Sequence, residues 1–323
     1  DLEWLVQPSC SIDALVPCPV IGQPGFVTFY HSPLLTTLHA IYTVLVGWFE
    51  ARALIRHFCP SAYAECFLWA FKDCDYLHEA MTAGWRPLTM IELPSLLGDL
   101  KQRLAAFHQA TQSGGCWERR RYLARKRDHN RWAATQLLEG LFDRHAKLLV
   151  VRVDVGYTEY AAPYMDASMV HQHRQRLCKA FHQHSLFTHL LGYIWKLEYG
   201  EYKGFHYHML FFFDGSKVRQ DVRYAQRIGE YWNTIITQGH GVYFNCNYRA
   251  EERYHANAMG LVTYHDAEKR QGLIHIIRYL TKIDEYATLT VHGDTFGHSQ
   301  PLKPQRSLEA MRLGRPRRHT SPA

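Results

Sequence analysis

GYIWKLEYG (residues 192–200) and GFHYHMLFFFDG (residues 204–215) decide the fold of this chain. Both stretches are rich in β-branched and aromatic residues, which favour strands. Only a short polar linker at residues 201–203 separates them. The pair therefore predicts an antiparallel β-hairpin.

Six further segments surround this hairpin in a regular order. They are a strand at 147–155, a helical stretch at 166–187, a helix at 217–237, short strands near 242–248 and 261–264, and a helix at 272–286. The order β-α-β-β-α-β-α predicts an α+β fold, with an antiparallel sheet of the ferredoxin-like or RRM-like kind. We expect the helices to lie on one face of this sheet.

The length of 323 residues suits two domains, each with its own core. Residues 34–145 show mostly helical patterns, with leucines at helical spacing. The sequence therefore predicts a mainly α-helical N-terminal domain at 1–145 and the sheet domain at 146–300. Residues 301–323 are Pro-rich and basic, which predicts a flexible tail.

The charge balance favours a polyanionic partner, because 37 Lys and Arg residues against 30 Asp and Glu give a formal net charge of +7. Eight cysteines without a Cys-x-x-Cys pair indicate reduced thiols rather than a disulfide scaffold. The apolar stretch at 34–49 contains His39 and is shorter than the ~20 apolar residues of a membrane span. We expect a cytoplasmic protein that does not contact a membrane.

A basic helix is predicted from about Trp117, and its first turns read ERRRYLARKRDHNR. The cationic side chains wrap more than one face, which suits either a solvated surface or contact with phosphate groups. The candidate phosphate-binding residues are Arg119, Arg120, Arg121, Arg125, Lys126, Arg127 and Arg131, together with Lys196 of the hairpin.

His206 and His208 flank Tyr207 in the second hairpin strand. Alternate residues of a strand point to the same face, so the two imidazoles have the geometry of two ligands on one metal ion. The other His-x-His sequences, at 171–173 and 182–184, lie in the helical stretch, where residues two apart diverge. We interpret those as incidental.

A third ligand can be sought across the hairpin. If the turn spans residues 200–204, Glu198 faces His206 and Lys196 faces His208, and cross-strand partners project to the same side. Two imidazoles and one carboxylate make a mixed nitrogen and oxygen site, which suits Mg²⁺ or Mn²⁺ engaged with a phosphate. The alternative for Glu198 is an ordinary surface glutamate near the end of a hairpin.

Tyr279 and Lys282 form a second constellation, because the spacing of three residues puts the phenol and the ammonium on one face of a helix. A tyrosine is a weak nucleophile at its ordinary pKa of ~10, so nearby positive charge and a polarised phosphate would be needed to activate it. For a single tyrosine, a packing role is the usual interpretation.

These motifs resemble those of the HUH endonucleases. FHYHMLFFF resembles the His-hydrophobic-His motif, RYLTK on a downstream helix resembles the Tyr-x-x-Lys motif, and LLVVRVDVGY occupies the place of the family's first motif. The resemblance covers about residues 147–285 and is nearest to prophage-borne and filamentous-phage gene-2-type initiators.

That resemblance implies a replication initiation protein for rolling-circle replication. It implies that His206, His208 and Glu198 hold Mg²⁺ or Mn²⁺. Tyr279 would attack a DNA phosphate, leaving a 5′-phosphotyrosine and a free 3′-OH, and Lys282 would assist through its charge. The expected partners are single-stranded or hairpin origin DNA and a host replication helicase, in the cytoplasm of a bacterial host.

Several alternatives remain open. A transposase or a relaxase shares the same chemistry, a DNA-binding regulator with a vestigial site would not use it, and an unrelated metal hydrolase would not need Tyr279. Tyr286 is a candidate second tyrosine. His275 lies four residues before Tyr279 and is a candidate additional ligand.

Overall fold

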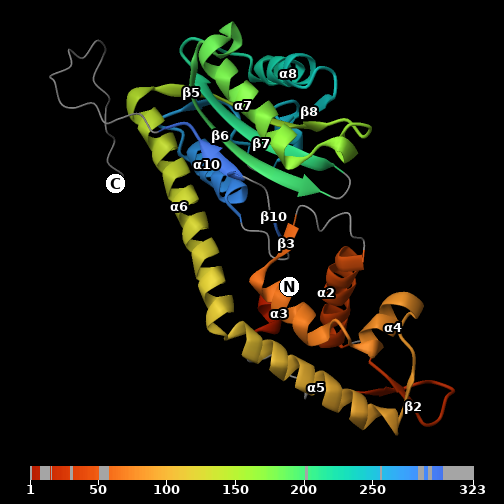
Figure 1. The fold of residues 1–323 in the computed structure, drawn as a ribbon. Helices are drawn as coiled ribbons and strands as arrows, with labels where there is room; N and C mark the ends of the chain where they lie inside the picture. Colours follow the sequence, from red (N-terminus) through yellow and green to blue (C-terminus); the bar gives the residue numbers. More distant parts are fainter. Residues whose placement is uncertain are drawn as a thin grey trace, which may run out of the picture.

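The computed structural model describes residues 2–7, 15, 17–29, 32–50, 58–200, 203–254, 257–282, 287–289 and 293–300. The N-terminal half is mainly helical, and the C-terminal half is a sheet with helices packed against both faces (Figure 1). The α+β fold class predicted from the sequence is confirmed.

The N-terminal half has one apolar core, to which the buried rings of Phe67, Phe71 and Phe107 contribute. Its elements are α1 (Leu2–Leu5), β1 (Cys18–Pro19), β2 (Phe26–Thr28), α2 (Pro33–Glu50), β3 (Phe58–Pro60), α3 (Ala62–Phe71), α4 (Asp75–Ala83), β4 (Leu88–Thr89) and α5 (Glu92–Thr111). Strands β1, β2 and β4 form a small antiparallel sheet. Such short strands leave no alternation for sequence analysis to detect.

The C-terminal half contains the predicted β-α-β-β-α-β unit. Its strands and helices are β5 (Lys147–Tyr157), α7 (Ala167–Gln183), β6 (Leu190–Gly200), β7 (Gly204–Asp214), α8 (Asp221–Tyr231), β8 (Gly241–Asn245), α9 (Ala250–Arg253), β9 (Gly260–Thr263), α10 (Ala267–Leu280), β10 (Ala287–Leu289) and β11 (Phe296–His298). Short 3-10 turns lie at Ala162–Tyr164 and Ser185–Phe187, and a π-helical turn lies at Trp232–Ile236.

The main sheet is antiparallel, with its described strands in the order β11-β6-β7-β5-β8. The last four, β6-β7-β5-β8, follow the strand order of a ferredoxin-like unit, in which the first and third strands are the central pair. Strand β9 also pairs with β5, through residues 147–150, which precede the residues 153–157 that β8 contacts.

Helices cover both faces of the sheet, so the expectation of helices on one face is wrong. The odd-numbered residues Phe205 to Phe213 of β7 pack with α7 and α8, whereas Leu210 and Phe212 pack with α10 and the helix α6 (Gly114–Arg144). The sequence carries the reason, because MLFFF at 209–213 is a continuous apolar run, typical of a strand buried on both sides.

Helix α6 joins the two halves of the molecule (Figure 1). Its 31 residues span about 46 Å at 1.5 Å per residue. Cys116 in its first turn belongs to the N-terminal core, whereas Ala134, Leu137 and Leu141 belong to the core beneath the sheet. A second link is the pairing of β10 with β3. The last turns of α6 are therefore part of the sheet domain.

Two helix boundaries differ from the prediction for local reasons. Helix α8 begins at Asp221 rather than near 217, because Gln220 has a left-handed backbone, with φ of 65°, that a helix cannot include. Helix α10 ends at Leu280, where the Thr281 hydroxyl donates back to the Ile277 carbonyl at 2.8 Å. Among the described residues, no helix is both long and apolar enough to cross a membrane.

Candidate metal centre

The β6–β7 hairpin brings together the three predicted ligands. The register pairs Glu198 with His206 and Lys196 with His208, as the position of the turn predicted. All four side chains project to the face that α6 and α10 cover. Ile194 and Leu210 lie an even number of residues away on the same strands, and both pack in the core with α6 and α10. The ligand atoms of Glu198, His206 and His208 lie within 4.8 Å of one another, so this group can hold a metal ion.

The donor atoms converge on one carboxylate oxygen. Glu198 Oε2 lies 3.0 Å from Nε2 of His208 and 3.7 Å from Nε2 of His206. Neighbouring ligands of a six-coordinate ion with bonds of about 2.1 Å are separated by about 3 Å. The spacing of these donors therefore fits one divalent cation with only small side-chain movements.

Each of the three side chains also has a partner that orients it. Nδ1 of His206 is 3.1 Å from the Gly204 carbonyl, and Nδ1 of His208 is 2.8 Å from Asp154 Oδ1. Lys196 Nζ bonds Oε1 of Glu198 at 2.8 Å, which leaves Oε2 to face the imidazoles. Such outer contacts fix the ring nitrogen that is free to bind a metal ion.

Without a metal ion, the negative charge of the carboxylates is offset by a protonated imidazole and by nearby cationic side chains. Burial opposes charge on His208, but Asp154 and Glu198 outweigh it and raise the pKa of this imidazole to about 9. Burial would raise the pKa of Glu198, yet bonds with His206, His208 and Lys196 hold it well below the usual range. Asp154 behaves in the same way, because His208 and Arg152 outweigh its burial and lower its pKa.

Asp154 and Arg152 are the site residues that sequence analysis missed. Both lie on β5, in the VRVDV segment, where Asp154 pairs across with His208 and Arg152 with Leu210. Their alternation with buried valines was visible in the sequence. Their position beside the histidines was not, because β5 and β7 are distant in the chain and no turn sets their register.

Tyr279 lies at the same site, on α10. Its ring centre is 5.9 Å from that of His208, in an edge-to-face arrangement, and its side chain is 48% exposed. The Arg152 guanidinium lies 5.5 Å from the centre of the Tyr279 ring. A half-exposed phenol beside three metal-binding groups and a cation is accessible to a substrate that binds at this face.

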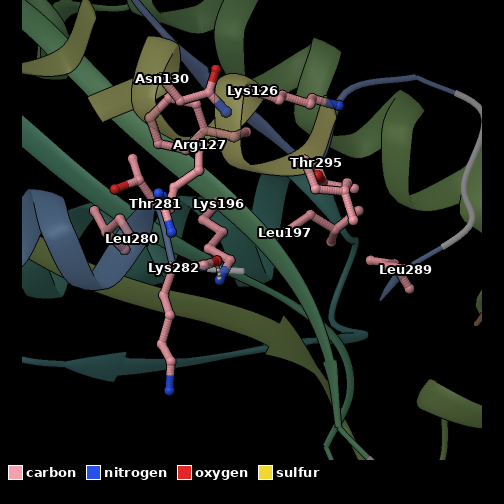
Figure 2. A pocket seen from close by; sticks show the side chains of 12 residues that line it. Lys126, Arg127, Asn130, Lys196, Leu197, Leu280, Thr281, Lys282, Leu289 and Thr295 are labelled. Carbon is pink, nitrogen blue, oxygen red and sulfur yellow. Dashed lines mark hydrogen bonds between the residues drawn. The ribbon is translucent and has the colours of Figure 1, made fainter. Parts of the chain in front are cut away.

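Lys282 follows the end of α10 and is exposed, so it does not share a helical face with Tyr279 as predicted. Its backbone carbonyl accepts a hydrogen bond from Lys196 Nζ at 3.2 Å. Figure 2 shows this contact and the Lys282 side chain, which extends away from the other labelled residues. Arg152, rather than the Lys282 side chain, is seen to contact the Tyr279 ring.

The predicted basic residues of α6 divide into two groups. Arg119 pairs with Glu65 and donates to the Pro60 carbonyl at 2.7 Å, so it fastens β3 and α3 to α6. Arg120 lies 4.0 Å over the Tyr63 ring and Arg121 lies 5.0 Å over the Trp117 ring. These three therefore have contacts within the protein.

The other group faces the sheet domain. Lys126 and Arg127 line a pocket of about 100 Å³ together with Lys196 and Lys282 (Figure 2). Lys196 also pairs with Glu198 of the metal centre. Asp128 pairs with Arg127 at 2.8 Å and offsets part of this charge. Arg125 is exposed on α6. The pocket thus collects cations from three separate elements.

The remaining candidates lie outside this group. His275 is exposed and lies 3.5 Å from Gln271, and it is absent from the metal-binding cluster of the described residues. His173 contacts the Tyr157 hydroxyl at 3.0 Å, which is a packing role. Tyr286 and the predicted tail at 301–323 lie outside the described residues.

A ferredoxin-like sheet that carries a His-x-His pair, a carboxylate and a tyrosine on one face defines a scaffold with a candidate metal centre. The chain belongs to the family of the YagK/YfjJ C-terminal domain, whose model matches residues 132–299. The match begins where α6 enters the sheet core and includes all three members of the metal-binding group and Tyr279. No curated protein and no solved structure matches the chain significantly.

Proposed function

We propose that this protein is a metal-dependent DNA-nicking enzyme of the HUH class, which initiates rolling-circle replication. One observation carries the proposal: the Tyr279 phenol and the group of Glu198, His206 and His208 meet on one face of the sheet, although their motifs are far apart in the sequence. A packing role for Tyr279 would not account for a ring that is half exposed beside metal-binding donors.

The donor set suits Mg²⁺ or Mn²⁺. Two imidazole nitrogens and one carboxylate oxygen leave positions of a six-coordinate ion open, and phosphate oxygens of DNA can fill them. Contacts from Gly204, Asp154 and Lys196 hold the donors in place. When bound, the cation would polarise the scissile phosphate and lower its negative charge.

Tyr279 is the proposed nucleophile. Its oxygen forms a bond to phosphorus, and the bond between phosphorus and the 3′-oxygen breaks. The phenol gives up its proton and the departing 3′-oxygen takes one up, so the products are a 5′-phosphotyrosine and a 3′-OH. The positive charge of Arg152 beside the ring favours the phenolate. Because the phosphotyrosine keeps the energy of the broken linkage, a 3′-OH can later reverse the step without ATP.

The cationic pocket supports a polyanionic substrate. Lys126, Arg127, Lys196 and Lys282 line it, and Lys196 pairs with Glu198 of the metal centre, so we expect backbone phosphates of a strand bound there to meet these cations. We therefore propose single-stranded or hairpin origin DNA as substrate and a host replication helicase as partner, in the bacterial cytoplasm. A transposase or a relaxase would use the same groups. A regulator with a vestigial site is disfavoured, because the donors and the tyrosine are all in place.

The experiment is a search for a covalent adduct. The protein is incubated with Mn²⁺ and single-stranded oligonucleotides from candidate origins, and adducts that survive denaturation are separated on a gel. We expect an adduct with the wild type and with Tyr122→Phe, a control at another exposed tyrosine, and none with Tyr279→Phe. Retention of the adduct in Tyr279→Phe would refute this nucleophile.

A metal hydrolase is the second candidate, because two histidines and a glutamate also form the ligand set of hydrolytic zinc sites. In that case a metal-bound water would attack the phosphodiester, and Tyr279 would be dispensable. Zn²⁺- or Mn²⁺-dependent cleavage by Tyr279→Phe, without any adduct in the wild type, would favour this function over the first.

A further inference from the structure

A row of side chains crosses the sheet at right angles to the strands and passes through the metal centre. Strand pairing places Phe244 of β8 beside Asp154, Asp154 beside His208, and His208 beside Lys196. Cross-strand neighbours project to the same face. Phe244 therefore lies on the face of the metal centre, two strands or about 10 Å from His208.

Phe244 and a neighbouring apolar residue are both exposed beside the metal centre. Its side chain is 48% exposed, and Val242, two residues earlier on the same face, is 46% exposed. Both line a mostly apolar pocket of about 680 Å³ that also reaches His206 and His208. A single exposed apolar residue needs no explanation. Two of them in a pocket shared with metal-binding histidines indicate a ligand with a flat apolar part.

The pocket keeps its depth because a glycine lies between the aromatic residue and the histidines. Gly156 pairs with Val242 across the strands, and it lines the same pocket. A Cβ atom at Gly156 would lie 3.3 Å from Cβ of His206, so a side chain here would crowd the histidine end of the pocket. The volume is in the range of sites that hold small organic groups, about 300–1,000 Å³.

Two arginine side chains lie against aromatic rings of this surface. The Arg253 guanidinium lies 4.9 Å from the centre of the Phe244 ring, and Arg249 lies 5.5 Å from that of the exposed Tyr248. Lys203 lines the pocket, and so do the carboxylates of Asp154 and Glu159. Glu252 offsets part of this charge through a 3.8 Å contact with Arg249. Aromatic rings with adjacent arginines are a usual surface for single-stranded nucleic acid.

We infer that Phe244 is a stacking platform for an unpaired nucleobase of the substrate strand, next to the phosphate that the metal centre holds. The inference rests on the proposed function for the identity of the strand, but it concerns binding rather than cleavage. A paired base is stacked on its neighbours inside the duplex, so only an unpaired base offers a free face to this ring. The platform therefore makes the protein selective for single strands at the site of reaction.

The test measures the contribution of bases to binding. The probes are fluorescent oligo(dT) and an abasic strand of the same length, bound to Tyr279→Phe protein in EDTA so that neither the covalent step nor metal-dependent hydrolysis occurs. Stacking of one base changes affinity by roughly 5- to 150-fold. We expect Tyr279→Phe to prefer oligo(dT) over the abasic strand by a factor in this range. Adding Phe244→Ala should remove that preference, whereas Phe244→Tyr should keep it.

Trp69→Ala is the matched control, because Trp69 is an even more exposed aromatic residue, on α3 of the N-terminal half. It should leave the preference unchanged. An undiminished preference for oligo(dT) after Phe244→Ala would overturn the inference. Equal binding of both probes by the Tyr279→Phe protein that retains Phe244 would also overturn it. Absence of the covalent adduct in the wild type bears only on the proposed function, since the preference for bases is measured without cleavage.

Discussion

Replacing Asp154 by asparagine tests the metal centre through a residue that is not one of the proposed ligands. Asp154 Oδ1 lies 2.8 Å from Nδ1 of the buried His208, on the opposite side of the ring from Glu198. Removing the partner of a metal-bound histidine lowers metal affinity by about 10- to 100-fold, which is about 1.4–2.8 kcal/mol. We expect the Kd for Mn²⁺ to rise by such a factor in Asp154→Asn.

The loss of Mn²⁺ affinity in Asp154→Asn should depend on pH. In the metal-free wild type, His208 keeps its second proton up to a pKa of about 9 and must release it before Nε2 can bind a cation. Asp154→Asn removes one of the two carboxylates that raise this pKa, so protons compete less with the metal ion in the variant. The deficit in Mn²⁺ affinity should therefore be largest above pH 9 and smaller near neutral pH.

The stability of the metal-free protein provides an independent measurement. Because the folded pKa of His208 is raised above its ordinary value of 6.5, the stabilisation is fully present below about pH 6.5 and is lost as pH rises through about 9. A shift of this size corresponds to about 3 kcal/mol. Urea denaturation in EDTA should show this loss in the wild type and a smaller one in Asp154→Asn.

Calorimetric titration with Mn²⁺ at several pH values measures the affinity. Asp143→Asn is the control, because Asp143 is an exposed carboxylate on α6. The reasoning is refuted if Asp154→Asn binds Mn²⁺ above pH 9 as tightly as the wild type and Asp143→Asn do. Such a result would mean that Asp154 does not support metal binding through His208.

Two further variants test the ligand set and the cationic pocket. Glu198→Ala should weaken Mn²⁺ binding in calorimetry and abolish nicking. The affinity for oligo(dT) should stay near the wild-type value, because cationic residues elsewhere hold the strand. Full nicking activity in this variant would assign the third ligand position to another residue. Lys126→Ala with Arg127→Ala should reduce the slope of log affinity against log salt by about 1.4, since each phosphate contact of a single strand contributes about 0.7. Arg120→Ala with Arg121→Ala should leave this slope nearly unchanged, because those side chains stack on Tyr63 and Trp117. Equal slopes for the two double variants would contradict the assignment of phosphate binding to the pocket.

The metal-binding group was accessible to sequence analysis because it lies within one hairpin. The linker between β6 and β7 is short, so it determines the register, and that register places Glu198 opposite His206. The β-α-β-β-α-β order followed from the alternation and length of the segments. Asp154 and Phe244 depend on contacts between distant strands, which no local turn determines.

The basic helix shows a different limit of sequence analysis. A run of arginines indicates positive charge, but the pattern does not reveal which of them find partners after folding. Arg119 forms an ion pair with Glu65 in the N-terminal half. Arg127 lies on a turn of α6 where the helix approaches the sheet domain, and so it lines the pocket. The same residue type on one helix therefore has two roles, which only the tertiary structure separates.

The alignment of the site depends on the register of β5, and a residue distant from the proposed chemistry secures it. A slip of one residue in β5 would turn Asp154 and Arg152 to the opposite face, away from His208 and Tyr279. Strands β8 and β9 contact different parts of β5 and leave a gap between them. The buried Asn247 side chain pairs with the backbone of β5 in this gap. It accepts a hydrogen bond from the Arg152 amide at 2.8 Å and donates one to the Val150 carbonyl at 3.0 Å. Asn247 thus has a positioning role, since the backbone it holds carries the outer partner of His208 and the cation beside Tyr279.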